Sequence, residues 1–212
     1  VVIPFLLTII VGKKRLPADQ VNEAGGLEEI SEEAKAGAAD GMGNAVMREK
    51  GVSQSIAGEL TAFLSGKAIP LAEVGDGVFS EGIMGDGMAI IPETETVYAP
   101  VDAEVSVLMP QSRHACGLKL ENGMEILLHI GIDTVGMNGD GFEYLVQEGQ
   151  RVSAGTPLIQ FDRAKIRAAG HPDVTVCIVT EEGNAQNIQF RTGIDVIKKE
   201  TTIGVFESYR GI

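Results

Sequence analysis

The stretch Gly123-Met-Glu-Ile-Leu-Leu-His-Ile-Gly-Ile-Asp-Thr-Val135 has the apolar pattern of a β-strand and carries a single imidazole, His129. Successive side chains of a strand point to opposite faces, so this segment has two distinct faces. The aliphatic face consists of Ile126, Leu128, Ile130 and Ile132. The other face carries His129 beside Glu125 and Leu127. We expect the core to take the aliphatic face, which leaves His129 directed toward the surface or a shallow depression.

A second histidine, His114, precedes this stretch in Gln111-Ser-Arg-His-Ala-Cys-Gly-Leu118. Between the two histidines, Glu121-Asn-Gly123 has the composition of a tight turn and favours a hairpin. The two imidazoles are therefore predicted to face each other across neighbouring strands. A period of two along the first strand places Ser112 on the same side as His114, and His114 is expected to be the more buried ring.

Strand patterns continue beyond Ser65, where short apolar runs are separated by Gly, Pro and Asn. From Val101 to Met109, apolar and polar residues alternate as in a half-buried strand. The 27 glycines and the aromatic content of only 5% suit a turn-rich β domain. The sequence therefore predicts an all-β fold, an antiparallel sandwich or barrel.

Composition limits the possible partners. A formal net charge of −13 argues against nucleic acid, because a phosphate backbone requires a basic surface. Cys116 and Cys177 fit neither a disulfide framework nor the spacing of a metal site, so we expect reduced thiols. His171, the third histidine, lies in Gly170-His-Pro-Asp173 and is expected to be an exposed loop residue.

The stretch around His129 closely resembles the active-site signature of the glucose-type IIA domains of the bacterial phosphoenolpyruvate-dependent sugar phosphotransferase system. That signature spaces a Gly, three apolar residues, a His, a Gly and a Thr as they stand from Gly123 to Val135. The resemblance extends over residues 59–206, with departures at Ala103, at Ser112 and between Glu181 and Gln189. It implies a compact β-sandwich that carries a phosphoryl group, with no cofactor and no metal.

The resemblance gives the two histidines different roles. His129 would accept the phosphoryl group, and His114 would stabilise it by donating an N–H to its oxygens. A neutral imidazole nitrogen is a competent nucleophile at pH 7, which agrees with this assignment. The ring nitrogen of His114 that does not face the phosphoryl group needs a hydrogen-bond partner that fixes the tautomer of the ring. Ser112 could supply this partner.

The same resemblance implies two protein partners, the small carrier protein HPr as donor and a cysteine of a IIB domain as acceptor. Asp86 and Asp133 match acidic positions beside the family's site, where they would attract a basic carrier surface. For Asp133 a turn cap after the strand is an equal alternative. The apolar residues around His129, Leu127 and Ile130 among them, would exclude water and form the docking patch.

The N-terminal part of the sequence has a different composition. Residues 1–12 are too short to span a bilayer, which needs about 20 apolar residues, and the basic run Lys13-Lys14-Arg15 follows them. We interpret them as the end of a membrane-embedded IIC domain, with a buried strand as the alternative. Residues 13–58 are interpreted as a flexible acidic tether, with a transient helix around 45–64 as one option. The IIA domain then spans 59–207, and 208–212 form a tail.

These interpretations together predict the IIA part of a permease fused in the order IIB, IIC, IIA, of β-glucoside or sucrose type, on the cytoplasmic side of the cell membrane. Three alternatives stay open. One is a regulatory binding protein whose phosphorylation state is recognised by other enzymes or transporters, and it would use the same patch around His129. A zinc peptidase needs at least three ligands, and only Asp133 or Asp86 could join the histidines. A biotinyl or lipoyl carrier would need a modified lysine between methionines, which the sequence lacks.

Overall fold

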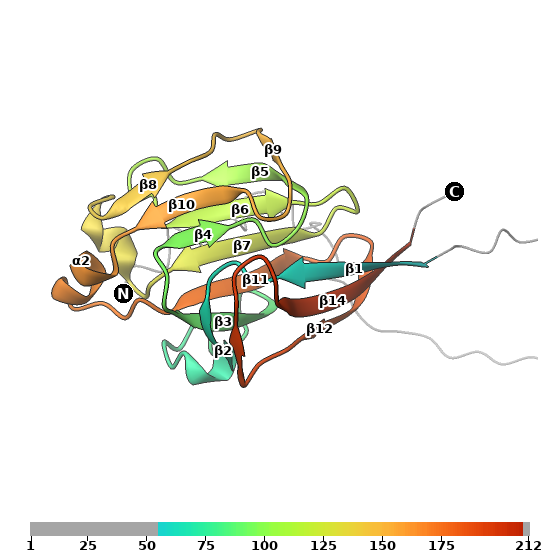
Figure 1. Cartoon of the computed structure of the whole chain (residues 1–212), viewed down its shortest axis with the longest axis horizontal. Coiled ribbons are helices and arrows are strands. Elements are labelled where there is room, and N and C mark those ends of the chain that lie inside the picture. Colours follow the sequence, from blue (N-terminus) through green and yellow to red (C-terminus); the bar gives the residue numbers. More distant parts are fainter. Residues whose placement is uncertain (1–54, 210–212) are drawn as a thin grey trace, which may run out of the picture. The chain divides into compact units, whose positions relative to one another are not determined.

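The computed structural model describes residues 55–209, and they form an almost entirely β structure (Figure 1). One short helix, α2 (Arg163–Ala168), and two 3-10 turns, η1 (Leu71–Glu73) and η2 (Thr134–Met137), are the other regular elements of this region. The strands are β1 (Ser55–Thr61), β2 (Gly66–Pro70), β3 (Asp86–Pro92), β4 (Thr96–Tyr98), β5 (Ala103–Leu108), β6 (Ala115–Lys119), β7 (Glu125–Ile130), β8 (Phe142–Tyr144), β9 (Arg151–Val152), β10 (Pro157–Phe161), β11 (Thr175–Glu181), β12 (Ala185–Phe190), β13 (Ile194–Val196) and β14 (Thr202–Tyr209).

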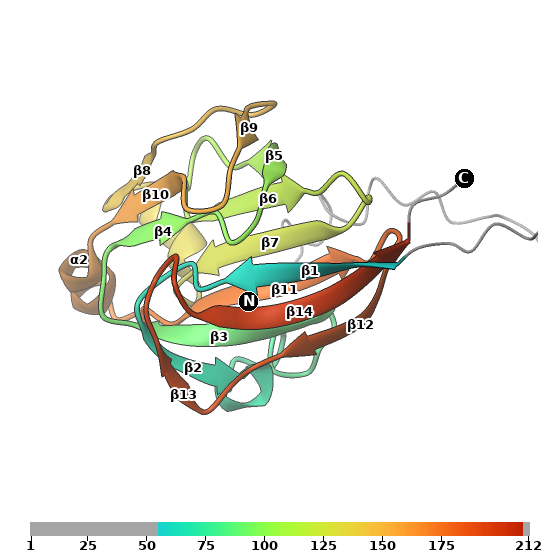
Figure 2. The same ribbon diagram turned by 45° about the vertical axis from the view of Figure 1, so that its right-hand side comes forward.

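The described strands make one large sheet and two small ones. The large sheet has the order β13-β2-β3-β11-β7-β6-β5-β9, and the small sheets have the orders β1-β14-β12 and β4-β10-β8. Every pairing among them is antiparallel. In both views the small sheets lie in front of the central strands β6, β7 and β11 (Figures 1 and 2).

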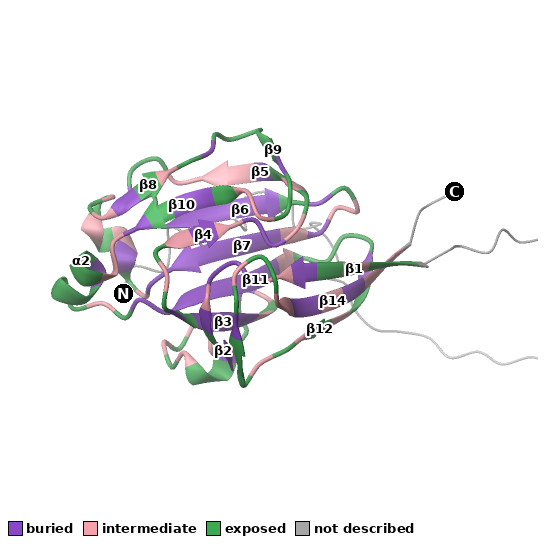
Figure 3. Cartoon of the chain, in the orientation of Figure 1, coloured by how far each residue is buried: buried purple, intermediate pink, exposed green. Residues whose placement is uncertain are grey.

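One hydrophobic core joins the large sheet to the small ones. It contains Leu60 of β1, Val97 of β4, Leu128 of β7 and Leu158 of β10, all fully buried. The central strands of the large sheet are buried along most of their length, whereas β12 and α2 are largely exposed (Figure 3). The predicted all-β, antiparallel sandwich is confirmed.

The hairpin predicted between the two histidines is also present. Strands β6 and β7 pair in register from Ala115 and His129 to Lys119 and Glu125. The turn is closed by a 3.0 Å hydrogen bond from the Gly123 N–H to the Leu120 carbonyl, and Gly123 has φ +85°. Gly123 tolerates this left-handed backbone because it has no Cβ.

The face of the large sheet that carries Leu127 and His129 is also covered. The prediction that this face opens to the surface is therefore wrong for most of β7. Leu127 on this face is only 3% exposed. The segment from Leu71 to Gly85 buries its own Leu71, Phe79 and Met84, and Phe79 packs beside His129. This cover comes from residues far from β7 in the sequence, so the alternation within β7 gives no sign of it.

The folded region is longer than the predicted 59–207. Residues 55–58 of β1 pair with residues 206–209 of β14, so the ladder runs from Ser55 to Tyr209. The suggested helix over 45–64 is wrong for Ser55–Thr61, because these residues form β1. The predicted IIC remnant, 1–12, and most of the predicted tether lie outside the described residues. No helix in the described part of the chain is long and apolar enough to cross a membrane.

Candidate active site

The two histidines lie side by side on the β6–β7 hairpin, as the sequence predicted. Ala115, which follows His114, pairs with His129, and the His114 carbonyl accepts a 2.8 Å hydrogen bond from the Ile130 N–H. The imidazole centroids are 4.5 Å apart, and the ring planes meet at 87°. This edge-to-face arrangement points an edge of one ring at the face of the other.

Both rings are buried, and only one nitrogen of each is sealed from solvent. His114 is 1% exposed and His129 is 6% exposed, which confirms that His114 is the more buried. The Nδ1 atoms of both rings are buried without a hydrogen-bond partner among the described residues. The Nε2 atoms are not buried in this way, so Nε2 is the nitrogen through which each ring reaches the surface. The Phe79 ring packs beside the His129 ring, with the two ring centroids 5.0 Å apart.

Burial keeps both imidazoles neutral at pH 7. Burial and, to a smaller extent, the charge of a protonated His129 lower the pKa of His114 to about 3. Burial also lowers the pKa of His129 to about 4, although the Gly131 carbonyl, the Asp76 carboxylate and the residue's own carbonyl oppose the shift. A neutral ring keeps one nitrogen lone pair free for nucleophilic attack.

The surroundings of His129 favour one tautomer. Its own carbonyl oxygen can be approached only by Nδ1, because Nε2 lies on the far side of the ring. The carbonyls of Gly131 and His129 attract an imidazole N–H, although Nδ1 makes no hydrogen bond of regular geometry. A proton on Nδ1 leaves the lone pair on Nε2, which is the accessible nitrogen.

Asp76 belongs to the site, and the sequence analysis did not identify it. Its carboxylate accepts hydrogen bonds from the backbone N–H groups of Val78, Phe79 and Ser80, at 3.3, 3.1 and 3.0 Å. Burial would raise the pKa of Asp76, but these bonds together lower it, so the group stays charged. The turn-forming Asp-Gly pair at residues 76–77 was the available signal, but nothing local connects it with His129.

Ser112 does not orient His114 as predicted. The serine is buried, but His114 Nδ1 has no hydrogen-bond partner, so no bond from Ser112 to this atom forms. The reason lies in Arg113, which has φ +52° and donates its N–H to the Met109 carbonyl. This turn breaks the period of two that placed Ser112 and His114 on one side.

The two predicted acidic residues lie in different places. Asp133 is exposed, four residues after His129, with φ +58° and no side-chain cap on η2, so its carboxylate is available to a partner. Asp86 is not near the pair. Val176 of β11 pairs with Ala89 of β3 on one side and with His129 of β7 on the other, so Ala89 and His129 lie at the same level of the sheet. Asp86 is three residues away from Ala89 along β3. That spacing corresponds to about 10 Å and to the opposite face of the sheet.

Leu127 and Ile130 offer no surface to a partner. Leu127 is only 3% exposed, and Ile130 is fully buried in the core on the other face. Their contribution is to packing, which corrects the prediction that they form the docking patch. The exposed apolar side chain in the covering segment is that of Ile83, which is 61% exposed.

Tyr144 supports the loop that carries His114, and the sequence analysis did not identify it. Its hydroxyl accepts a 2.8 Å hydrogen bond from the Met109 N–H and donates a 2.5 Å bond to the Ala115 carbonyl. Burial raises its pKa well above the ordinary value, so the hydroxyl keeps its proton. One side chain thus closes the loop from Met109 to Ala115, which includes His114.

The described residues contain no group of three or more His, Cys, Asp or Glu side chains that could hold a metal ion. Within residues 55–209, the histidine pair is not joined by a third ligand of the kind the zinc-peptidase alternative requires.

The fold and site define a β-sandwich protein with a neutral, partly accessible histidine pair, and comparison with known proteins specifies its class. Residues 58–185 match the family described as phosphoenolpyruvate-dependent sugar phosphotransferase system, EIIA 1. Among solved structures, the chain is similar to the glucose permease IIA from Mycoplasma capricolum, with 32% sequence identity and a TM-score of 0.64. The match covers 71% of this chain and 96% of that chain.

This chain belongs to the glucose-type EIIA family of the sugar phosphotransferase system. Domains of this family are phosphoryl carriers, and their partners are HPr and IIB domains.

Proposed function

We propose that Nε2 of His129 accepts a phosphoryl group from phospho-HPr and passes it to a cysteine of a IIB domain. The observation that carries this proposal is the buried pair itself, in which Nδ1 of His129 is sealed and Nε2 reaches the surface. The low pKa of His129, about 4, supports it further, because the acceptor needs no deprotonation before it attacks.

The transfer is a displacement at phosphorus. The Nε2 lone pair of His129 forms a new P–N bond while the P–N bond to the donor histidine breaks, and the electron pair returns to the donor ring. In the second transfer a IIB thiolate forms a P–S bond, and the pair of the breaking P–N bond returns to Nε2. Such transition states are loose, so the protein contributes mainly position and charge stabilisation.

His114 is proposed to stabilise the transferred group. Its ring centroid is 4.5 Å from that of His129, which brings its accessible edge within reach of a phosphoryl group on Nε2. A neutral ring with its proton on Nε2 can donate one hydrogen bond to a phosphoryl oxygen. Burial disfavours a second proton on this ring, because the pKa of His114 is lowered to about 3.

The surface around Nε2 is suited to a carrier with a basic, partly apolar face. Asp133, four residues after His129, and Asp76, whose charge acts on the ring, supply negative charge, and Ile83 in the segment that includes Phe79 supplies exposed apolar area. Charge complementarity of this kind speeds encounter more than it strengthens the final complex. The further idea that the chain is the IIA part of a fused β-glucoside or sucrose permease is a proposal from the sequence alone.

The decisive experiment is intact mass of the chain after incubation with phosphoenolpyruvate, Enzyme I and HPr. We expect an acid-labile phosphoryl adduct on the wild-type chain and on His171→Ala, and none on His129→Ala. His114→Ala is expected to accept the group but to pass it slowly to a IIB domain. An unlabelled wild-type chain, beside a labelled control IIA domain, would refute the proposal.

A further inference from the structure

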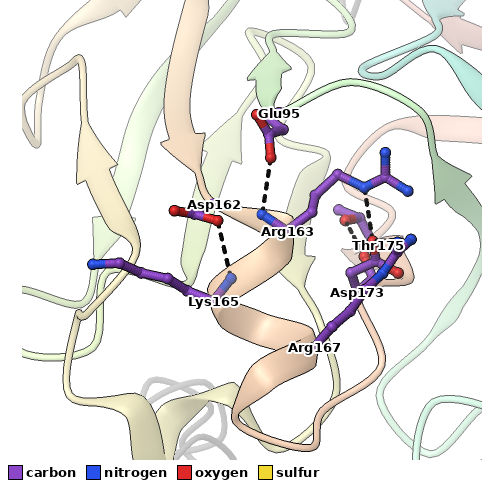
Figure 4. Close-up of polar contacts among 7 residues, drawn as sticks. All are labelled: Glu95, Asp162, Arg163, Lys165, Arg167, Asp173 and Thr175. Carbon is purple, nitrogen blue, oxygen red and sulfur yellow. Dashed lines mark hydrogen bonds and ion pairs between the residues drawn. The ribbon is translucent and has the colours of Figure 1, made fainter.

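Asp173 is a buried carboxylate in the loop between α2 and β11. The Asp173 side chain is 10% exposed, and one of its oxygens, Oδ2, accepts from Arg163 Nε at 2.7 Å and from Arg167 Nη2 at 2.9 Å (Figure 4). Both arginines belong to α2, whose first turn is fixed by the Asp162 carboxylate accepting from the Lys165 N–H. The cluster therefore ties the Asp173 loop to α2.

The loop held in this way is bonded to the chain just after His129. The carbonyl of Val174 accepts a 3.0 Å hydrogen bond from the Gly131 N–H. The carbonyl of Pro172 accepts a 3.1 Å bond from the Ile132 N–H. Asp173 stands between these two acceptors in the chain, so the ion pairs of its side chain help to hold both of them in place.

Gly131 transmits this constraint to the imidazole. Its φ is +71°, and a Cβ placed on it would lie 2.4 Å from Thr134 Cγ2 and 3.0 Å from the Pro172 carbonyl oxygen. The peptide is thus held tightly between the Pro172 loop and η2. Its carbonyl is one of the two that attract the N–H of His129, so its orientation bears on which nitrogen holds the proton.

We propose that Asp173, clamped by Arg163 and Arg167, is a positioning residue for His129, which acts through the 172–174 loop and Gly131 to keep the proton on Nδ1 and the lone pair on Nε2. The inference rests on the proposed role of His129 as acceptor. Asp173 touches neither the ring nor a transferred group. Removing its charge eliminates the ion pairs to both arginines, and the weaker hold on the loop lets the Pro172 and Val174 carbonyls move. The ring then samples both tautomers, and attack from Nε2 slows.

The test compares Asp173→Asn with wild type in two measurements on the folded chain. Imidazole nitrogen NMR reports the His129 tautomer, and rapid quench with phospho-HPr reports the rate of phosphoryl uptake. We expect a mixture of tautomers and a loss of about tenfold or more in rate, since small misplacements of a reacting group have effects of this size. Asp173→Glu, which keeps the charge, is expected to restore part of the rate.

Glu125→Gln is the matched control, because it breaks the 3.0 Å Lys119–Glu125 ion pair at the other end of β7 and is expected to change neither readout. An Asp173→Asn protein with the wild-type tautomer and rate overturns the inference, as does one that loses only thermal stability. If Asp173→Asn does not fold, Arg167→Gln replaces it in the same two measurements. We then expect a smaller shift in the His129 tautomer and a smaller loss of rate, both in the same direction. Failure of wild type to take up phosphate would refute the proposed function, while the tautomer measurement would still test Asp173.

Discussion

The histidine pair should make the stability of the fold fall steeply in mildly acidic solution. The ordinary pKa of an imidazole is 6.5, and burial lowers it to about 4 in His129 and about 3 in His114. Below pH 6.5 the unfolded chain therefore binds protons that the folded chain does not bind. The stability associated with neutral, buried rings is fully present above pH 6.5 and is lost as the pH falls toward 4.

The size of this loss follows from the two shifts. At pH 5 each unfolded imidazole is almost fully protonated, whereas each folded ring is almost neutral. The unfolding free energy at pH 5 is therefore lower than at pH 8 by about 2 kcal/mol per ring, or by about 4 kcal/mol for the pair. This is a large part of the 5–15 kcal/mol that typically stabilises a folded protein. The pKa of Asp76 is lowered, so this carboxylate stays charged between pH 8 and 5 and adds nothing to the change in this window.

Urea denaturation followed by far-ultraviolet circular dichroism would measure the effect, since the chain has no tryptophan. Between pH 8 and 5 the unfolding free energy of the wild type should decrease. In His114→Gln and in His129→Gln we expect this decrease to be about half as large. His171→Gln, which alters a histidine outside the pair, is the control and should keep the wild-type decrease. If both pair variants keep it too, the rings are not neutral in the folded state and the reasoning fails.

Two further substitutions test the supports of the site. Tyr144→Phe removes the hydroxyl that bonds Met109 and Ala115, and should lower the unfolding free energy by about 1–3 kcal/mol in urea denaturation. Its transfer of phosphate to a IIB domain should also slow, and unchanged values of both would contradict a role in holding His114. Gly131→Ala places a Cβ 2.4 Å from Thr134 Cγ2 at φ +71°, so it should destabilise the fold by about 2 kcal/mol or more. Wild-type stability of this variant, measured in the same way, would mean that the loop relaxes freely.

The parts of the site that the sequence predicted are those set by local pattern. The alternation in β7 correctly assigned Ile126 and Leu128 to the core, because the period of a strand is fixed by backbone geometry. The Asn-Gly turn correctly predicted the hairpin, and the hairpin register brings His114 and His129 together. Each of these inferences needs only residues within one hairpin.

The parts that the sequence analysis missed depend on residues distant in the chain or on a single backbone angle. The left-handed Arg113 moves Ser112 away from its predicted role, and a non-glycine residue with positive φ has no reliable sequence signal. Leu127 was expected at the surface because the Leu71–Gly85 segment, which packs on the same face at His129, is distant from β7 in the sequence. The start of β1 at Ser55 was missed because its partner, β14, lies at the other end of the domain.

The covering segment also explains how one site can be both dry and accessible. Phe79 buries one side of the His129 ring, and its own N–H helps to hold the Asp76 carboxylate in place. A single turn thus supplies the apolar contact that keeps the imidazole neutral and the charge that limits how far its pKa falls. A more buried histidine could not meet another protein, and a more exposed one would lose its phosphoryl group to water more readily. The 6% exposure of His129, through Nε2, lies between these extremes.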